Sequence, residues 1–204
     1  MFRIQQEIEN KIIIQKSEFI THLFRVESIE DVNNILENIR KKYYDATHNC
    51  YAYIIGDNQD IQKCSDDGEP QKTAGAPMMD VLKKKNMTNI LAVVTRYFGG
   101  ILLGAGGLVR AYSSSVSEAL AKAKLYTTID VVDFIITTSY SGYNTIINIK
   151  EINILNTSFT DSVIITGYIK KDLFDNLNEI LYKNKIDPNS LKKIGDSFKE
   201  IPID

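Results

Sequence analysis

Apolar residues recur first at strand spacing and then at helix spacing along residues 90–112, and the rest of the chain is arranged around this segment. The run Ile90–Thr95 is apolar and rich in β-branched residues, which is typical of a buried strand. Spacings of three and four then predict one helix face made of Leu108, Val109, Tyr112, Val116, Ala119, Leu120 and Ala123. Between the two patterns lie Gly99, Gly100, Gly104, Gly106 and Gly107. The segment therefore predicts a strand, a glycine loop and a helix that ends near Leu125.

The N-terminal residues predict a pair of strands. Residues 12–14 are an apolar run, and residues 20–26 alternate between apolar and polar side chains. Lys16 and Ser17 lie between these stretches and are predicted to form the turn. We therefore expect residues 7–27 to contribute two strands to a sheet.

A helix and a further strand are predicted next. Ser28 with Asp31 three positions later resembles a capping box, and apolar residues follow at helical spacing to Tyr43. The residues of His48–Ile55 alternate with period two and predict a strand. Residues 56–77 are predicted to be one long loop, followed by a helix that starts at Pro77 and ends near residue 86.

The chain after residue 129 predicts a second unit with a different order of elements. Strand patterns lie at 131–140, near Phe159, at 163–169 and after Asp187-Pro188-Asn189. Helix patterns lie at 143–155 and after Asp172. The order β-α-β-β-α-β is that of a ferredoxin-like fold. We therefore predict an α+β protein with two domains, residues 1–130 and 131–204.

The glycine loop suggests an anion-binding site. A helix that starts at such a loop offers free N–H groups and the positive end of its dipole. Arg96 ends the strand and Arg110 is placed in the first helical turn, so both are predicted to face the same concavity. The spacing is not that of a P-loop, because no lysine follows the glycines. The alternative is that the glycines only allow the helix to pack closely on the strand.

Three carboxylates follow one another in the long loop, at Asp66, Asp67 and Glu69. They could hold a hard cation, pair with Arg96 and Arg110, or lie in solvent; we favour the last two over a metal. A long polar loop with its own turn residues is expected to pack over the glycine concavity. Further contributors from this loop and the preceding strand are Lys72, Thr73 and His48.

Other kinds of chemistry find little support in the residues. His48, Cys50 and Cys64 resemble part of a metal site, but a full set of ligands is not evident, so we expect no metal there. A catalytic triad is not evident, because only His22 and His48 exist and neither lies near a G-x-S-x-G segment. We therefore predict no catalytic residues and no cofactor.

Composition is that of an ordinary soluble protein. Hydrophobic residues make up 44% and charged residues 25%, and the net charge of −2 argues against a protein that wraps nucleic acid by bulk charge. Any contact with RNA is therefore expected at a local patch. The N-terminus lacks an apolar signal segment and two cysteines form no disulfide framework, so we expect a reduced, cytoplasmic setting without a membrane span.

Four motifs together resemble the YigZ/Impact family, and they span residues 16–112. They are Lys16–Phe19, His48–Ala52, Ser65–Pro70 with Thr73–Pro77, and Val94–Gly100 with Leu103–Tyr112. The resemblance implies an N-terminal domain like the second domain of a small-subunit ribosomal protein, a fold also seen in GHMP kinases. It implies a C-terminal domain like the last domain of elongation factor G. Eukaryotic members regulate translation by binding a protein partner through an additional N-terminal domain, which this chain does not match.

The resemblance favours one function over another. We expect a translation-associated protein that binds RNA or the ribosome without catalysis, with a protein partner in translation control as a further prospect. The alternative is an enzyme or binder of a phosphorylated small molecule or nucleotide at the glycine loop. On either reading, Arg96→Ala is expected to weaken anion binding while the fold persists. Gly106→Val is expected to harm both, if Gly106 has a positive φ.

Overall fold

The computed structural model describes residues 1–203, and its internal contacts divide the chain into two compact units. Unit 1 comprises Met1–Thr127, with which the chain end from Pro202 is grouped, and unit 2 comprises Thr128–Ile201. Each unit has its own sheet and its own helices, so the α+β class is confirmed. No helix within residues 1–203 is long and apolar enough to span a membrane.

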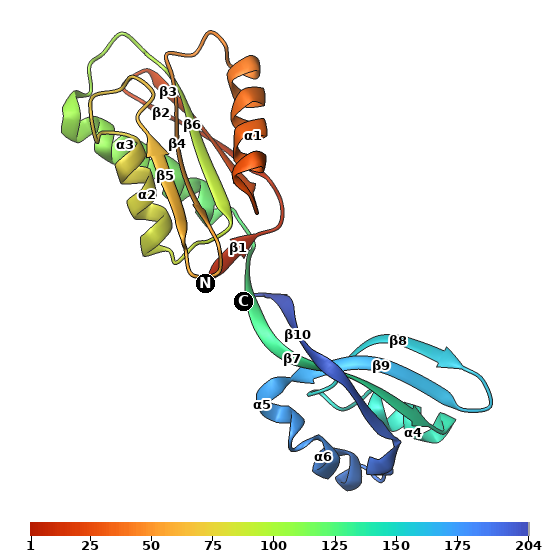
Figure 1. The fold of residues 1–204 in the computed structure, drawn as a ribbon. Coiled ribbons are helices and arrows are strands. Elements are labelled where there is room, and N and C mark those ends of the chain that lie inside the picture. Colours follow the sequence, from red (N-terminus) through yellow and green to blue (C-terminus); the bar gives the residue numbers. More distant parts are fainter. Residues whose placement is uncertain (204) are drawn as a thin grey trace. The chain divides into compact units, whose positions relative to one another are not determined.

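Unit 1 is built around an antiparallel sheet in the order β2-β3-β6-β4-β5 (Figure 1). Its strands are β1 (Phe2–Ile4), β2 (Ile8–Ile14), β3 (Ser17–Arg25), β4 (His48–Ile55), β5 (Ile61–Ser65) and β6 (Ile90–Tyr97). Its helices are α1 (Ile29–Lys42), α2 (Gly75–Lys84) and α3 (Gly104–Ala121). β1 stands outside this order and pairs with the first residues of β7 (Leu125–Thr138). The sequence did not predict β1, which is only three residues long.

The predicted hairpin and first helix are confirmed, with one shift. β2 and β3 pair from Ile14↔Ser17 outwards, so the turn is formed by Gln15 and Lys16 rather than by Lys16 and Ser17. Both turn residues have positive φ, 45° and 66°, which is the geometry that suits the twist of a two-residue hairpin. The capping box at Ser28 and Asp31 is present and fixes the start of α1.

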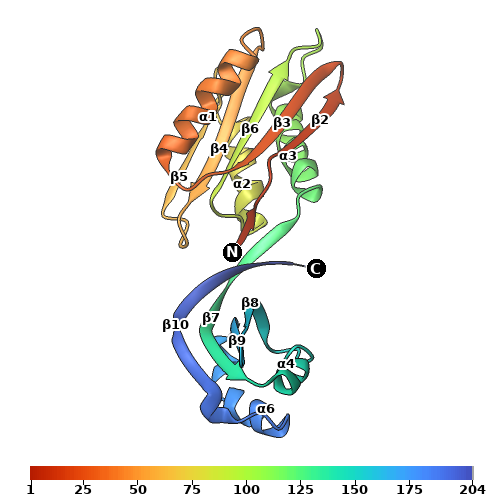
Figure 2. The same cartoon turned by 90° about the vertical axis from the view of Figure 1, so that its right-hand side faces the viewer.

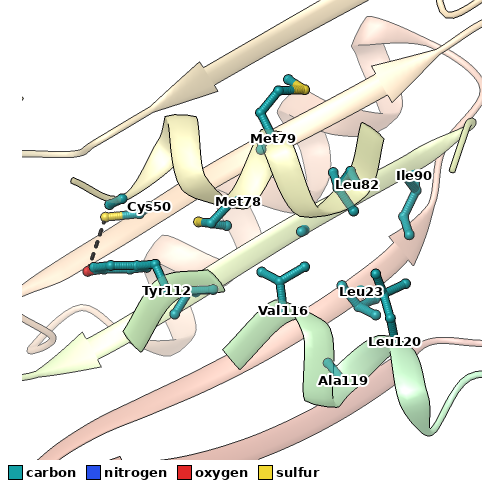
Figure 3. Close-up of a cluster of buried hydrophobic side chains, with 14 of the residues drawn as sticks. Leu23, Cys50, Met78, Met79, Leu82, Ile90, Tyr112, Val116, Ala119 and Leu120 are labelled. Carbon is teal, nitrogen blue, oxygen red and sulfur yellow. Dashed lines mark hydrogen bonds between the residues drawn. The ribbon is translucent and has the colours of Figure 1, made fainter. Parts of the chain in front are cut away.

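Helices cover both faces of the sheet of unit 1 (Figures 1 and 2). α1 packs on the face that carries Tyr51, Tyr53, Leu91 and Val93. α2 and α3 pack on the other face, where Tyr112 and Val116 meet Cys50 and Met78 (Figure 3). Because β6 is central and covered on both sides, it is the continuous apolar run that the sequence predicted.

The predicted long loop is partly wrong. Residues 61–65 form the edge strand β5, which pairs with β4 from Ile55↔Ile61 to Tyr51↔Ser65. Its residues are mostly exposed, so the alternation that marks a half-buried strand is missing from the sequence. α2 also starts two residues earlier than predicted, at Gly75, because Asp66 accepts hydrogen bonds from the N–H groups at its N-terminus.

Unit 2 has the predicted β-α-β-β-α-β order. Its elements are β7, α4 (Tyr140–Ile146), β8 (Asn153–Phe159), β9 (Val163–Lys170), α5 (Lys171–Phe174), α6 (Leu177–Lys183), the 3₁₀ turn η1 (Pro188–Ser190) and β10 (Leu191–Pro202). β7 pairs with β9 and β10, and β9 also pairs with β8. The second helix is divided in two, and the Asn176 N–H bonds the Leu173 carbonyl between the two parts, which is the i to i+3 pattern of a 3₁₀ turn.

Candidate ligand-binding site

A cavity of about 350 Å³ lies where the end of β6 meets the start of α3. Its polar side chains are Thr47, His48, Glu69 and Arg96. The rest of its wall is Pro70, Phe98, Leu102, Leu103, Gly104, Ala105 and Leu108. We call it the α3 cavity. The carboxylate loop and the glycine loop both contribute to it, so the structure brings together two segments that the sequence placed at one concavity.

The side chain of Arg96 is buried, although arginine is usually found on the surface. It lies on β6 directly between Phe19 of β3 and His48 of β4, and its side chain is only 6% exposed. Its guanidinium carbon lies 5.4 Å from the centroid of the Phe19 ring and 5.6 Å from that of Phe98. Arg96 Nε is buried and has no hydrogen-bond partner among residues 1–203. A buried guanidinium of this kind needs a counter-charge to be stable.

Glu69 supplies the counter-charge. Its Oε1 accepts a hydrogen bond of 2.6 Å from Arg96 Nη1 and one of 2.7 Å from the Tyr112 hydroxyl. The Glu69 side chain is 3% exposed, so this is a buried ion pair supported by a third group. Burial raises the pKa of Tyr112, so its hydroxyl stays protonated and continues to donate to Glu69.

His48 lines the cavity beside this pair, and its orientation is fixed by the turn at Asp67-Gly68. His48 Nδ1 lies 2.7 Å from the Asp67 carbonyl oxygen, which can only accept, so Nδ1 carries the proton. Gly68 has φ of +87°, and a Cβ there would lie 3.3 Å from His48 Nδ1, so glycine suits both the turn and the imidazole. His48 Nε2 lies 3.8 Å from Glu69 Oε2, which is beyond hydrogen-bond distance.

The other two carboxylates hold the loop itself. Asp66 accepts hydrogen bonds from the N–H groups of Lys72, Ala74 and Gly75. Asp67 accepts one from the Asn49 N–H at 2.6 Å. The pairing that the sequence favoured is therefore present for Glu69 and Arg96, whereas Asp66 and Asp67 bind backbone groups.

Other polar residues that the sequence singled out make their contacts outside the cavity. The single S–H of Cys50 is shared between the Asp66 carbonyl at 2.9 Å and the Tyr112 hydroxyl at 3.3 Å; Figure 3 shows the contact with Tyr112. Thr73 donates to the Pro70 carbonyl, and neither Thr73 nor Lys72 lines the α3 cavity. Within residues 1–203, no cluster of three or more His, Cys, Asp or Glu side chains is placed to hold a metal ion.

The glycines divide between a loop and the first turn of α3, which differs from the prediction. Gly99 and Gly100 lie in the loop, and α3 already begins at Gly104 and includes Gly106 and Gly107. Positive φ occurs at Gly100 and Gly104 but not at Gly106, so the reason given for Gly106→Val is wrong. Gly99 is needed for another reason, because a Cβ there would run into the backbone of Lys16 and Ser17.

Arg110 is also placed differently from the prediction. It lies in the second turn of α3, is exposed, and does not line the cavity. The two arginines therefore do not face one concavity. What the cavity does receive from α3 is its N-terminus, which has no side-chain cap and no acidic residue in its first turn. The first N–H groups of α3 are thus available to an anion.

Two contributions to the site were missed from the sequence. Tyr112 was assigned only to the packing face of the helix, yet its hydroxyl reaches Glu69. Phe98, Ile101 and Leu102 are exposed apolar residues of the glycine loop, and Leu102 is 85% exposed. The sequence does carry a signal for this loop, because Ile101 and Leu102 are apolar where loops are usually polar. Exposed apolar residues grouped together often belong to a binding surface.

Comparison with known proteins places the chain in a family. Residues 15–120 match the family described as the Impact N-terminal domain. The protein is 55% identical over 119 residues to the IMPACT family member YvyE of Bacillus subtilis, a match that covers 58% of this chain and 55% of YvyE. It is 47% identical over 109 residues to YigZ of Escherichia coli, covering 52% of this chain and 53% of YigZ.

One solved structure is similar over nearly the whole chain. It is a crystal structure described only as that of a hypothetical protein, with a TM-score of 0.59, 29% identity, and coverage of 95% of this chain and 96% of the other. The fold and the sequence match together define an Impact-type protein of two α+β units. The chain belongs to the Impact family. It spans about half the length of the curated relatives it matches.

Proposed function

We propose that this protein is a cytoplasmic, translation-associated protein that binds RNA, free or within the ribosome, without catalysing a reaction. The observation that carries the proposal is the uncapped N-terminus of α3 beside an exposed aromatic ring and a cavity. Membership of the Impact family supports the link to translation, because the resemblance implies translational regulation for its eukaryotic members.

Each part of this surface suits a segment of single-stranded RNA. Free helix N–H groups bind a phosphate, and glycines at 104 and 106 leave room for it, since a Cβ at either would meet at most Arg110 Nη1 at 3.7 Å. Phe98 is 46% exposed and offers a face on which an unstacked base can lie. Exposed Arg110 adds a cation near the phosphate.

Binding rather than catalysis is proposed because the cavity shows a buried ion pair and a hydroxyl that donates to it, and not a nucleophile activated by a base. Arg96 and Glu69 form a buried pair, and the Tyr112 hydroxyl is taken by Glu69. A nucleophile with an adjacent base is the usual arrangement for covalent catalysis, and these groups do not form one.

The test is co-sedimentation with ribosomes at several salt concentrations, together with binding of short RNA oligomers. We expect binding that weakens as salt rises, because phosphate contacts release counterions. Phe98→Ala should weaken binding roughly 5- to 10-fold, within the range for one base stacked on an aromatic ring. Phe159→Ala is the matched control, since Phe159 is a similarly exposed aromatic of unit 2 at 53%. Absence of the protein from ribosomes and RNA even at low salt would remove the proposal.

A second candidate is binding of a phosphorylated small molecule or nucleotide in the α3 cavity. Its volume of about 350 Å³ favours this, because small-molecule sites start near 300 Å³. A thermal-shift screen of nucleotides and phosphosugars tests it, since a ligand of the folded state must raise the melting temperature.

A protein partner in translation control is a third candidate, for which exposed Ile101 and Leu102 offer apolar contact.

A further inference from the structure

The polar part of the α3 cavity presents two hydrogen-bond acceptors, on Glu69 and His48, that do not accept a hydrogen bond within residues 1–203. Glu69 Oε1 is occupied by Arg96 and Tyr112, whereas Glu69 Oε2 has no hydrogen bond within residues 1–203. In the neutral imidazole, His48 Nε2 is an acceptor, because Nδ1 carries the proton and donates to the Asp67 carbonyl. These two atoms, the acceptor pair, lie 3.8 Å apart on side chains that line the same cavity.

With a neutral His48, two acceptors at this separation repel one another and cannot satisfy each other by a hydrogen bond. An acceptor in a cavity with largely apolar walls costs free energy unless a ligand or water donates to it. A ligand that fills the cavity therefore has to bring two N–H or O–H groups side by side on one edge. A ligand edge that carries an acceptor at either position would be rejected.

We propose that the α3 cavity receives a guanine base and that the acceptor pair recognises its Watson–Crick edge. On that edge N1–H and the 2-amino group stand next to each other, so one can donate to Glu69 Oε2 and the other to His48 Nε2. Adenine and cytosine each bring one amino group beside an acceptor nitrogen. Uracil brings one N–H between two carbonyl oxygens, which would face the acceptor pair unfavourably.

The rest of the cavity suits the remainder of a guanine nucleotide. Leu103, Leu108 and Pro70 provide apolar wall for the faces of a flat base, and Phe98 stands at the rim. Gly104 and Ala105 bring the N-terminus of α3 into the same cavity, where it can hold the phosphate. The proposal rests on the RNA-binding function proposed above, although a free guanine nucleotide carries the same recognition edge.

The experiment compares ligands that differ by single groups. Fluorescence anisotropy is measured with a uridine-rich octamer that carries one central guanosine, with the same octamer carrying inosine, and with the all-uridine octamer. Inosine lacks only the 2-amino group. We expect the guanosine octamer to bind about 3- to 10-fold more tightly than the inosine octamer, the effect of one hydrogen bond to a neutral acceptor. GMP and IMP are tested in parallel by thermal shift.

The variant Glu69→Gln replaces one acceptor of the pair by a donor. In Glu69→Gln, the amide oxygen can keep the bonds from Arg96 and Tyr112, which turns the NH₂ group towards the cavity in place of Oε2. That NH₂ would face guanine N1–H, so the preference for guanosine over uridine should disappear. Glu118→Gln is the matched control, because it makes the same chemical change at an exposed residue of α3, and it should keep the preference.

The outcomes separate this inference from the proposed function. Equal binding of the guanosine, inosine and uridine octamers would overturn the guanine assignment and leave RNA binding intact. If GMP but not IMP raises the melting temperature and none of the octamers binds, guanine recognition is supported and the RNA-binding proposal is removed. Failure of every octamer and of GMP would overturn both.

Discussion

Unit 1 buries polar and charged side chains together with its apolar core, whereas the buried side chains of unit 2, residues 128–201, are apolar apart from single polar atoms such as Asp133 Oδ1 and Ser197 Oγ. In unit 1 the buried polar set includes His22, Asn49, Glu69, Arg96 and Ser115. Burying such groups costs free energy unless each finds a partner, so a fold selected only for stability tends to avoid them. The charged pair inside unit 1 therefore carries a desolvation cost that the apolar core of unit 2 avoids.

If size alone were the criterion, the candidate binding site would be a cavity in unit 2. A cavity of about 640 Å³ lies in unit 2, lined by hydroxyl groups such as those of Ser139, Thr145 and Ser190. Its polar groups belong to turns and caps, for example Ser139, which caps α4. The α3 cavity is smaller, but its acceptors are held in place by buried partners. Fixed polar groups of this kind distinguish a binding site from a surface hollow.

The first prediction concerns whether the two units fold separately, with a boundary near residue 130. Residues 128–130 lie between the stretch of β7 that pairs with β1 and the stretch that pairs with β9. We expect mild trypsin or chymotrypsin treatment to cut first near here, after Lys122, Lys124 or Tyr126, and to leave two resistant fragments on a gel. First cuts confined to residues 140–200 would instead make unit 2 the less stable part.

The second prediction compares a buried ion pair with an exposed one. Arg96→Ala leaves the Glu69 carboxylate buried without its counter-charge, so we expect the free energy of unfolding to fall by about 3–5 kcal/mol. This replaces the expectation that the fold of that variant persists unchanged. Lys183→Ala removes the exposed partner of Glu179 in unit 2 and should change stability little. Urea unfolding of both variants measures the difference, and equal effects would contradict it.

Much of the fold could be predicted because the elements follow strong local patterns. The capping box at Ser28 and the apolar runs of β4 and β6 each specify their own element. β5 could not be predicted, because an exposed edge strand is stabilised by pairing with β4 rather than by its own pattern. The start of α2 likewise depends on Asp66, which lies eight or more residues earlier in the chain.

The site was predictable in its segments but not in its contacts. Periodicity placed Arg96 at the end of a strand, and turn residues placed Glu69 in a loop that was expected to cover it. Arg110 was misplaced because the start of α3 was set too late; α3 begins at Gly104, so Arg110 lies one helical turn farther from the N-terminus that borders the cavity. The tautomer of His48 and the open oxygen of Glu69 depend on distances across the fold that no sequence pattern carries.

The third prediction separates the two glycines of the loop. A Cβ at Gly99 would meet the backbone of Lys16 and Ser17, which cannot move aside like a flexible side chain. We expect Gly99→Ala to lower the free energy of unfolding by about 1–3 kcal/mol through overpacking. Gly100→Ala has open space but φ of +82°, and should cost about 1 kcal/mol through backbone strain. A larger cost at Gly100 than at Gly99 would argue against the close approach.

The fourth prediction concerns the two cysteines. Cys64 on β5 is exposed, whereas Cys50 is fully buried and burial raises the pKa of its thiol. A thiol reagent at pH 8 should label Cys64 quickly and Cys50 only after unfolding, as counted by mass spectrometry. Because the raised pKa disfavours the thiolate in the folded state, stability should also fall as the pH rises above about 9, the usual pKa of a thiol. Rapid double labelling of the folded protein would show that Cys50 is accessible.

The smallest expected effect is a gain in stability at Gly106. Its φ is not positive, it lies in the first turn of α3, and a Cβ there would meet only Arg110 Nη1 at 3.7 Å, an ordinary contact. Gly106→Ala should therefore raise the free energy of unfolding by about 0.5–1 kcal/mol, since alanine loses less backbone freedom in a helix. Gly107→Ala is the control, because its Cβ would lie 3.0 Å from Leu103 Cβ and should gain less. If Gly106→Ala instead unfolds at a lower urea concentration than the parent, position 106 needs glycine for its backbone conformation. That result would contradict the helical geometry described above for the first turn of α3.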